Sequence, residues 1–200
     1  AGEGLGAQET GVSGSPAALV RAALEYRLAR PVVVDLTDAD DAAAALAEAL
    51  ALGADVVTAN KKPLAGDVAD YHRLQEAAQR TGRFLRAEAT VGAGLPVMDT
   101  LEMLLASGDA LVAAEGCFSG TLNYVLSQLE DGVPFSEAVA DAKARGYTEP
   151  DPVADLAGAD MARKAVILGR LSGLAVDVAP ALEGLVDAGW AGLAPEALQE

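Results

Sequence analysis

Short apolar runs alternate with longer helical stretches through the first 90 residues, and this alternation most constrains the fold. The runs at 32–36, 55–58 and 84–89 are typical of strands, and the continuous run at 32–36 predicts a strand buried on both faces. The stretches 16–30, 40–52 and 67–80 have helical spacing of alanine and leucine. Strands separated by helices predict an α/β fold with a parallel sheet.

The pattern changes after about residue 90. We expect helices at 96–106, 120–129, 136–145 and 155–172, and a single strand at 110–118. The change predicts two domains, 1–89 and 90–200. The first fourteen residues are rich in glycine and are expected to form a loop.

Charge and composition exclude several classes of partner. The chain has 14 Lys and Arg against 30 Asp and Glu, a net charge of -16, which argues against nucleic acid and anionic membrane surfaces. Every apolar run is far shorter than the roughly 18 residues of a membrane span. Cys117 has no second cysteine to pair with, so we expect a cytoplasmic protein, with Cys117 as a small core residue.

The turns that follow the strands are candidate ligand sites, because parallel sheets bind ligands at the carboxyl ends of their strands. Thr37 follows the first run, and Asn60, Lys61 and Lys62 follow the second. The two lysines are either solvated or supply a contact to a phosphate or carboxylate. Glu88 begins a glycine-rich turn, which either leads into the next helix or binds a cation through Glu88 and backbone carbonyls.

Asp160 and Lys164 are four residues apart on one predicted helix, so their side chains are neighbours. They form either a surface ion pair or a positioned proton donor with its carboxylate. Met161, Leu168 and Leu171 share the face of Lys164, which places the lysine on or beside the apolar stripe. Upstream, Glu149 precedes and Asp155 follows a pair of prolines. These acids either stabilise the positive end of a helix dipole or face a cationic group.

Four ordered segments resemble homoserine dehydrogenase. They are TANKKP at 58–63, EATVGAGLP at 88–96, SGTLNY at 119–124 and GYTEPDPVADLAGADMARK at 146–164. The resemblance covers about residues 16–175. It implies a partial Rossmann-like parallel sheet followed by an α+β substrate and catalytic domain.

The resemblance also implies an activity. The family interconverts L-homoserine and L-aspartate 4-semialdehyde by hydride transfer with NAD or NADP, a step toward threonine and methionine. The partner would be a small amino-acid substrate, and the assembly a homodimer or higher homo-oligomer.

Residue roles follow from the same resemblance. Lys164 matches the proton donor, and Lys61 matches a lysine that contacts cofactor and substrate. Glu149 and Asp160 match substrate-binding acids, with Asp155 nearby. Thr37 and Asn60 are expected beside the cofactor. A monovalent cation, sodium or potassium, is expected at the Glu88 carboxylate and the carbonyls of Val91, Ala93 and Leu95.

Two departures keep alternatives open. The first is that Val153 and Ala154 stand where the family usually has an Arg-Asp pair. The second is that the sequence is expected to begin after the family's glycine-rich pyrophosphate fingerprint and to end before the later segment that completes the family's sheet. We expect weak cofactor binding by the chain alone. The alternatives are a non-catalytic assembly module of a larger enzyme and a different amino-acid dehydrogenase.

Overall fold

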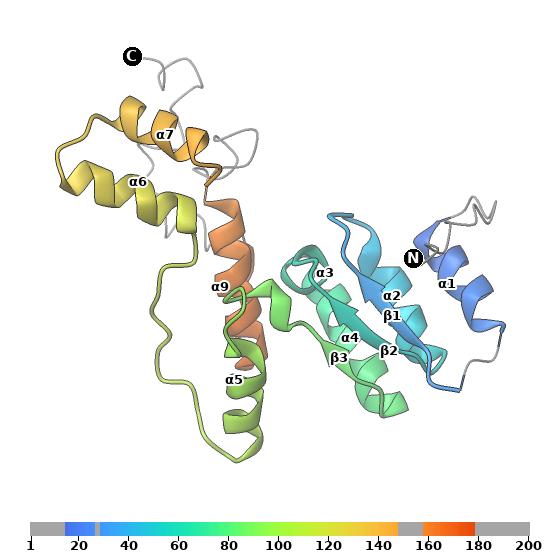
Figure 1. Ribbon diagram of the computed structural model, residues 1–200. Coiled ribbons are helices and arrows are strands. Elements are labelled where there is room, and N and C mark those ends of the chain that lie inside the picture. Colours follow the sequence, from blue (N-terminus) through green and yellow to red (C-terminus); the bar gives the residue numbers. More distant parts are fainter. Residues whose placement is uncertain (1–14, 27–28, 148–157, 179–200) are drawn as a thin grey trace, which may run out of the picture.

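A three-stranded parallel sheet forms the first half of the molecule. The computed structural model describes residues 15–26, 29–147 and 158–178 (Figure 1). Strands β1 (Val32–Asp35), β2 (Asp55–Thr58) and β3 (Leu85–Arg86) lie in the order β1-β2-β3, and both pairs are parallel. The predicted α/β sheet is confirmed. The third strand is shorter than expected, because the chain turns into the 3-10 helix η1 (Glu88–Thr90).

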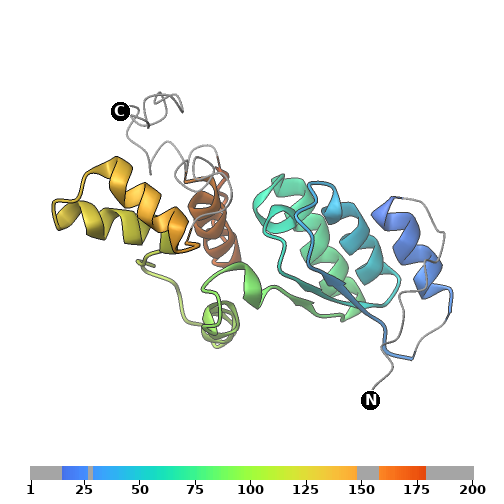
Figure 2. The ribbon, with the colours of Figure 1, turned by 45° about the horizontal axis from the view of Figure 1, so that its top comes forward.

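Helices cover one face of this sheet. They are α1 (Pro16–Leu24), α2 (Ala42–Ala51), the short α3 (Lys62–Ala65) and α4 (Val68–Thr81). Figures 1 and 2 show α2 and α4 on the same side of the sheet, with α1 outside them against α2. Leu50, Val56 and Leu74 are fully buried between these layers. The predicted helices are confirmed here, but α1 ends at Leu24 and does not reach residue 30 as expected, and α3 was not expected.

The expected burial of the first strand on both faces is wrong. Val32 and Val34 are 54% and 56% exposed, whereas Asp35 is buried. Successive side chains of a strand point to opposite faces, and among the described residues helices pack only on the face that carries Val33 and Asp35. Val57 of β2 is likewise partly exposed.

The second half is helical. It contains α5 (Val97–Ala106), α6 (Gly120–Glu130), α7 (Phe135–Ala144) and α9 (Ala159–Leu171). α6 and α7 pack as a pair around a small separate core of Val125, Ala138 and Ala142. α9 stands between this pair and the sheet (Figures 1 and 2), and Val166, Ile167 and Leu168 join the core of the sheet.

Three expectations for this half are wrong. The segment 110–118 forms no strand, because no other strand of the described chain pairs with its backbone. Cys117 on this segment is exposed and is not a core residue. The expected helix 155–172 does not run through Gly158, whose left-handed backbone (φ 73°) precedes the first residue of α9, Ala159; residues 155–157 lie outside the described chain.

Some expectations fall outside the described residues, namely the loop at 1–14 and the turn that carries Glu149 and Asp155. Within the described chain, every helix is too short or too polar to cross a bilayer.

Candidate active site

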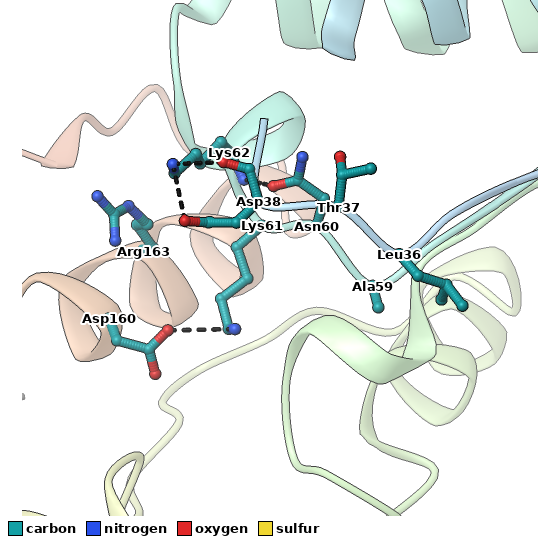
Figure 3. Close-up of a pocket in the computed structure, with 9 residues that line it drawn as sticks. All are labelled: Leu36, Thr37, Asp38, Ala59, Asn60, Lys61, Lys62, Asp160 and Arg163. Carbon is teal, nitrogen blue, oxygen red and sulfur yellow. Dashed lines mark hydrogen bonds and ion pairs between the residues drawn. The ribbon is translucent and has the colours of Figure 1, made fainter. Parts of the chain in front are cut away.

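A cavity of about 220 Å³ lies at the carboxyl ends of β1 and β2, and the first turn of α9 forms another part of its wall (Figure 3). Its walls are Leu36, Thr37, Asp38, Ala59, Asn60, Lys61, Lys62, Asp160 and Arg163. The structure therefore brings four of the predicted site residues together, Thr37, Asn60, Lys61 and Asp160. They come from three segments that are far apart in the sequence.

Buried hydrogen bonds shape the turn after β2. Thr58 is 1% exposed, and its hydroxyl accepts the N–H of Asn60 at 3.0 Å. The Asn60 side chain donates to the carbonyl of Ala39 (2.9 Å) and accepts the N–H of Lys62 (3.0 Å). The Asn60 side chain thus connects the turn after β1 to the turn after β2. It also binds the first residue of α3, Lys62, so the backbone on both sides of Lys61 is held in place.

The turn after β1 is held in the same way. The Asp35 carboxylate accepts the N–H and hydroxyl of Thr37, at 2.9 and 2.7 Å. Lys62 reaches across from α3 and donates to the Asp38 carbonyl at 2.7 Å, and its ammonium lies 3.0 Å from the Asp40 carboxylate. The hydrogen bond that Lys62 donates to the Asp40 carboxylate, with a second that it donates to the Asp38 carboxylate, raises the pKa of Lys62 above its usual value. Lys62 therefore cross-links the two turns.

Asp160 lies between two lysines. Its carboxylate is 2.7 Å from the ammonium of Lys164, one helical turn away, and 3.2 Å from that of Lys61 (Figure 3 shows the second contact). Partial burial alone would raise the pKa of Asp160. The hydrogen bond from Lys164 and the charge of Lys61 together outweigh burial, so the pKa lies below its usual value. The carboxylate is therefore ionised at neutral pH.

Lys164 connects this cluster to the segment that leads into α6. Its ammonium donates to the carbonyl of Phe118 at 2.6 Å, and its side chain is only 19% exposed, as its predicted place beside the apolar stripe implies. Phe118 is followed by Ser119, the N-cap of α6. A second, open cavity of about 420 Å³ begins at the first turn of α6, and its lining is Gly120, Thr121, Asn123, Tyr124, Ser127 and Tyr147.

The expected cation loop is built around the start of α5. Both oxygens of Glu88 accept backbone N–H groups of this helix, from Met98 at 3.0 Å and Asp99 at 2.7 Å. The carbonyl of Leu95 accepts the N–H of Val97 at 2.8 Å. Glu88 therefore caps α5, a structural role that the sequence reasoning did not consider.

Sequence reasoning missed further residues of the site. Arg163, one turn after Asp160 on α9, lines the cavity. Helical spacing placed Arg163 beside Asp160, and this signal was available. Asp35 and Thr58 are buried and hold the two turns by hydrogen bonds. In the sequence, only their position as polar residues at the end of an apolar run could have indicated this role.

Family models match nearly the whole chain. The model described as "Homoserine dehydrogenase, NAD binding domain" matches residues 8–88, and the model described as "Homoserine dehydrogenase" matches residues 96–187. The chain belongs to the homoserine dehydrogenase family. Both halves of the structure, the parallel sheet and the helical part that carries Asp160 and Lys164, are thus parts of one family architecture.

Individual homoserine dehydrogenases agree with this assignment. The chloroplastic bifunctional aspartokinase/homoserine dehydrogenase of Daucus carota is 46% identical over 147 residues, which is 74% of this chain and 16% of the relative. The bifunctional enzyme of Haemophilus influenzae is 41% identical over 166 residues, 82% of this chain and 20% of the relative. A hyperthermophilic archaeal homoserine dehydrogenase solved with NADPH is 30% identical, with a TM-score of 0.64 over 80% of this chain and 47% of that one. The chain thus spans about a fifth or less of these two bifunctional relatives.

Proposed function

We propose that this chain carries the hydride-transfer site of a homoserine dehydrogenase, which interconverts L-homoserine and L-aspartate 4-semialdehyde with NAD(P). One observation carries the proposal: the Lys61–Asp160–Lys164 cluster lies at the carboxyl end of a parallel sheet, where such sheets bind their ligands. A half-buried ammonium beside a carboxylate is suited to proton transfer.

Lys164 is the proton donor in this proposal. A bound nicotinamide would accept the hydride when homoserine is oxidised and would donate it when the aldehyde is reduced. As the aldehyde is reduced, its oxygen gains negative charge, and the Lys164 ammonium stabilises that charge and protonates it. In the oxidation of homoserine the proton of the hydroxyl returns to Lys164. Among the described residues, Phe118 and Asp160 take two of the three N–H groups of Lys164, and the third is proposed to bind the substrate oxygen.

The acids bind the substrate's ammonium group. Asp160 is ionised and 41% exposed, so its carboxylate is accessible from the cavity. Glu149 and Asp155, which lie outside the described residues, are proposed to complete this site on the basis of the family resemblance. Lys61 is proposed to contact both substrate and cofactor.

The ends of β1 and β2 are proposed to contact the nicotinamide dinucleotide. Thr37, Asn60 and Lys61 line the strand ends, and Lys61 supplies a positive charge for an anionic group. The side chains of Thr37 and Asn60 are held by hydrogen bonds to Asp35 and Ala39, so they would shape the wall that contacts the cofactor. Their rigidity would lower the entropy cost of binding.

We also propose a sodium or potassium site at the turn after η1. The carbonyls of Val91 and Ala93 accept no hydrogen bond among the described residues, and Ala93 has a positive φ of 52°, which turns the loop tightly. A carboxylate oxygen that accepts one N–H keeps a lone pair for a cation. Titration with potassium chloride against a choline chloride control should raise thermal stability in the wild type and not in Glu88→Ala; equal shifts would contradict the site.

Three further expectations stand as proposals. They are a division into domains at residues 89 and 90, a homodimer or higher homo-oligomer, and a cytoplasmic location.

The proposed activity is tested by the reduction of NADP or NAD with homoserine, followed by absorbance, in the natural protein that contains this sequence. Lys164→Met should lower kcat about 10²- to 10⁴-fold, the range for general acid–base catalysis. Lys143→Met removes an exposed lysine of α7 and should leave kcat unchanged. Equal rates in both variants would reject the role of Lys164, and no turnover in the wild type would favour a non-catalytic module.

A further inference from the structure

Arg170, near the end of α9, is a buried cation held by four acceptors. Its side chain is only 1% exposed. The guanidinium donates to the carbonyls of Leu64 and Gly66, both at 2.8 Å, and to the carbonyl of Val176 at 3.0 Å; the Asp177 carboxylate lies 2.8 Å away. Two of these acceptors are more than 100 residues from Arg170 in the sequence. Arg170 therefore joins distant parts of the chain.

The two distant acceptors belong to the segment that carries Lys61. Leu64 lies in α3 and Gly66 ends it, whereas Lys61 is the residue directly before α3. Asp160 lies at the other end of α9, ten residues or roughly 15 Å from Arg170. α3 and α9 are thus joined twice, by Arg170 at one end and by the Lys61–Asp160 ion pair at the other. A tilt of α9 at the Arg170 end would move Asp160 relative to Lys61.

Arginine suits this junction better than other residues do. Its planar guanidinium has five N–H donors in a fixed arrangement, enough for the four acceptors in one rotamer. A lysine has three donors on a flexible stem, and methionine would remove the donor from the three carbonyls and from the Asp177 carboxylate. The ring of Tyr71 on α4 lies 5.6 Å from the guanidinium carbon and completes the enclosure.

We propose that Arg170 is a positioning residue of the active site: it fixes α9 against α3 and thereby holds Asp160 within reach of Lys61. The kinetic part of this inference rests on the proposed function, whereas the geometric part does not. Arg170 itself lines neither cavity of the site.

The geometric part is tested by NMR titration of the Asp160 carboxyl in the chain of this sequence. Among the described residues, Lys61 and Lys164 contact Asp160, and Lys62, Arg163 and Asp38 are the other charged residues that line the same cavity. If α9 tilts, Lys164 keeps its distance to Asp160 because both lie on α9, whereas the distance from Lys61 to Asp160 increases. Arg170→Met should therefore raise the pKa of Asp160 toward its usual value, and Lys61→Met should add little in that background.

Ile167→Val is the matched control, because it removes one buried methyl group from the same helix without touching the guanidinium bonds. It should lower thermal stability and leave the pKa of Asp160 unchanged. Arg170→Lys, which keeps a cation and some donors, should give an intermediate pKa, and it decides the question if Arg170→Met does not fold. A pKa of Asp160 that is the same in the wild type and the folded Arg170 variants would overturn the proposal.

Kinetics separate this inference from the proposed function. In the homoserine assay Arg170→Lys should lower kcat by up to about 10²-fold, the cost of a misplaced group, with a smaller change in KM. Ile167→Val should stay within about twofold, since it leaves the geometry of the site intact. An inactive wild type would reject the proposed function, but the titration would still test the position of Asp160.

Discussion

The Asp160 carboxylate and the Lys164 ammonium form a 2.7 Å ion pair across one turn of α9, and the Phe118 carbonyl accepts a second N–H of the same ammonium. The first contact is local, whereas the second joins residues 46 positions apart. Together they fix the ammonium at the junction between the sheet and the α6–α7 pair. The contacts that the described residues make to this ammonium leave its third N–H for the proposed substrate contact.

Asp160 should make the stability of the chain depend on pH. Its pKa is lowered in the folded state, so its ionised form stabilises the fold above the usual carboxyl pKa of about 3.9, and this stabilisation is lost as the pH falls through the lower folded value. Urea unfolding of the wild type and Asp160→Asn should differ more at neutral pH than near pH ~3. Asp70→Asn, at an exposed ion pair with Arg73, serves as the control. A gap that does not change with pH would contradict this prediction.

Thr58→Val should destabilise the turn that carries Lys61. Valine has nearly the same shape but leaves the buried N–H of Asn60 without its acceptor. The free energy of unfolding should fall by about 1–3 kcal/mol, the cost of an unsatisfied buried donor. Thr58→Ser keeps the hydroxyl and should lose less. Equal stability of the valine variant and the wild type in urea unfolding would show that the hydroxyl contributes nothing.

Glu88→Ala should weaken the start of α5, because the carboxylate accepts the N–H groups of Met98 and Asp99. We expect a loss of about 0.5–2 kcal/mol, typical of a removed helix cap. Hydrogen exchange at these two amides should become faster. Glu76→Ala, at an exposed position within α4, is the control and should change neither quantity. Unchanged exchange in Glu88→Ala would argue against the cap.

Leu74→Ala should cost about 2–5 kcal/mol, because it opens a cavity in the core between the sheet and α4. Leu74 is 0% exposed, whereas Leu52 is 52% exposed and should tolerate the same change with a much smaller loss. Denaturant unfolding of both variants measures the difference. Similar losses at the two positions would mean that the core is placed elsewhere.

The helices and the parallel strands of the first half could be predicted because their signals are local. The spacing of apolar residues, Ser15 before Pro16 and Gly82 after α4 mark the elements, and each mark is found in the structure. The pairing of Asp160 with Lys164 was predictable for the same reason, since a four-residue spacing on a helix makes neighbours.

Exposure and long-range contact were not predictable in this way. An apolar run at 32–36 looks the same whether one or both faces of its strand are covered, and Val32 and Val34 proved exposed. The apolar segment 110–118 has the composition of a strand, but a strand requires a partner for its backbone groups, and the sequence does not show one.

The sequence by itself determined the order of elements, the family motifs and the residue types of the site. Only the tertiary structure decided that Lys61 meets Asp160, that Lys62 cross-links two turns, and that Arg170 joins α9 to a carbonyl 106 residues away. The reason is physical: backbone geometry sets which side chains share a face of one element, but contacts between elements depend on how all of the buried surfaces pack at once.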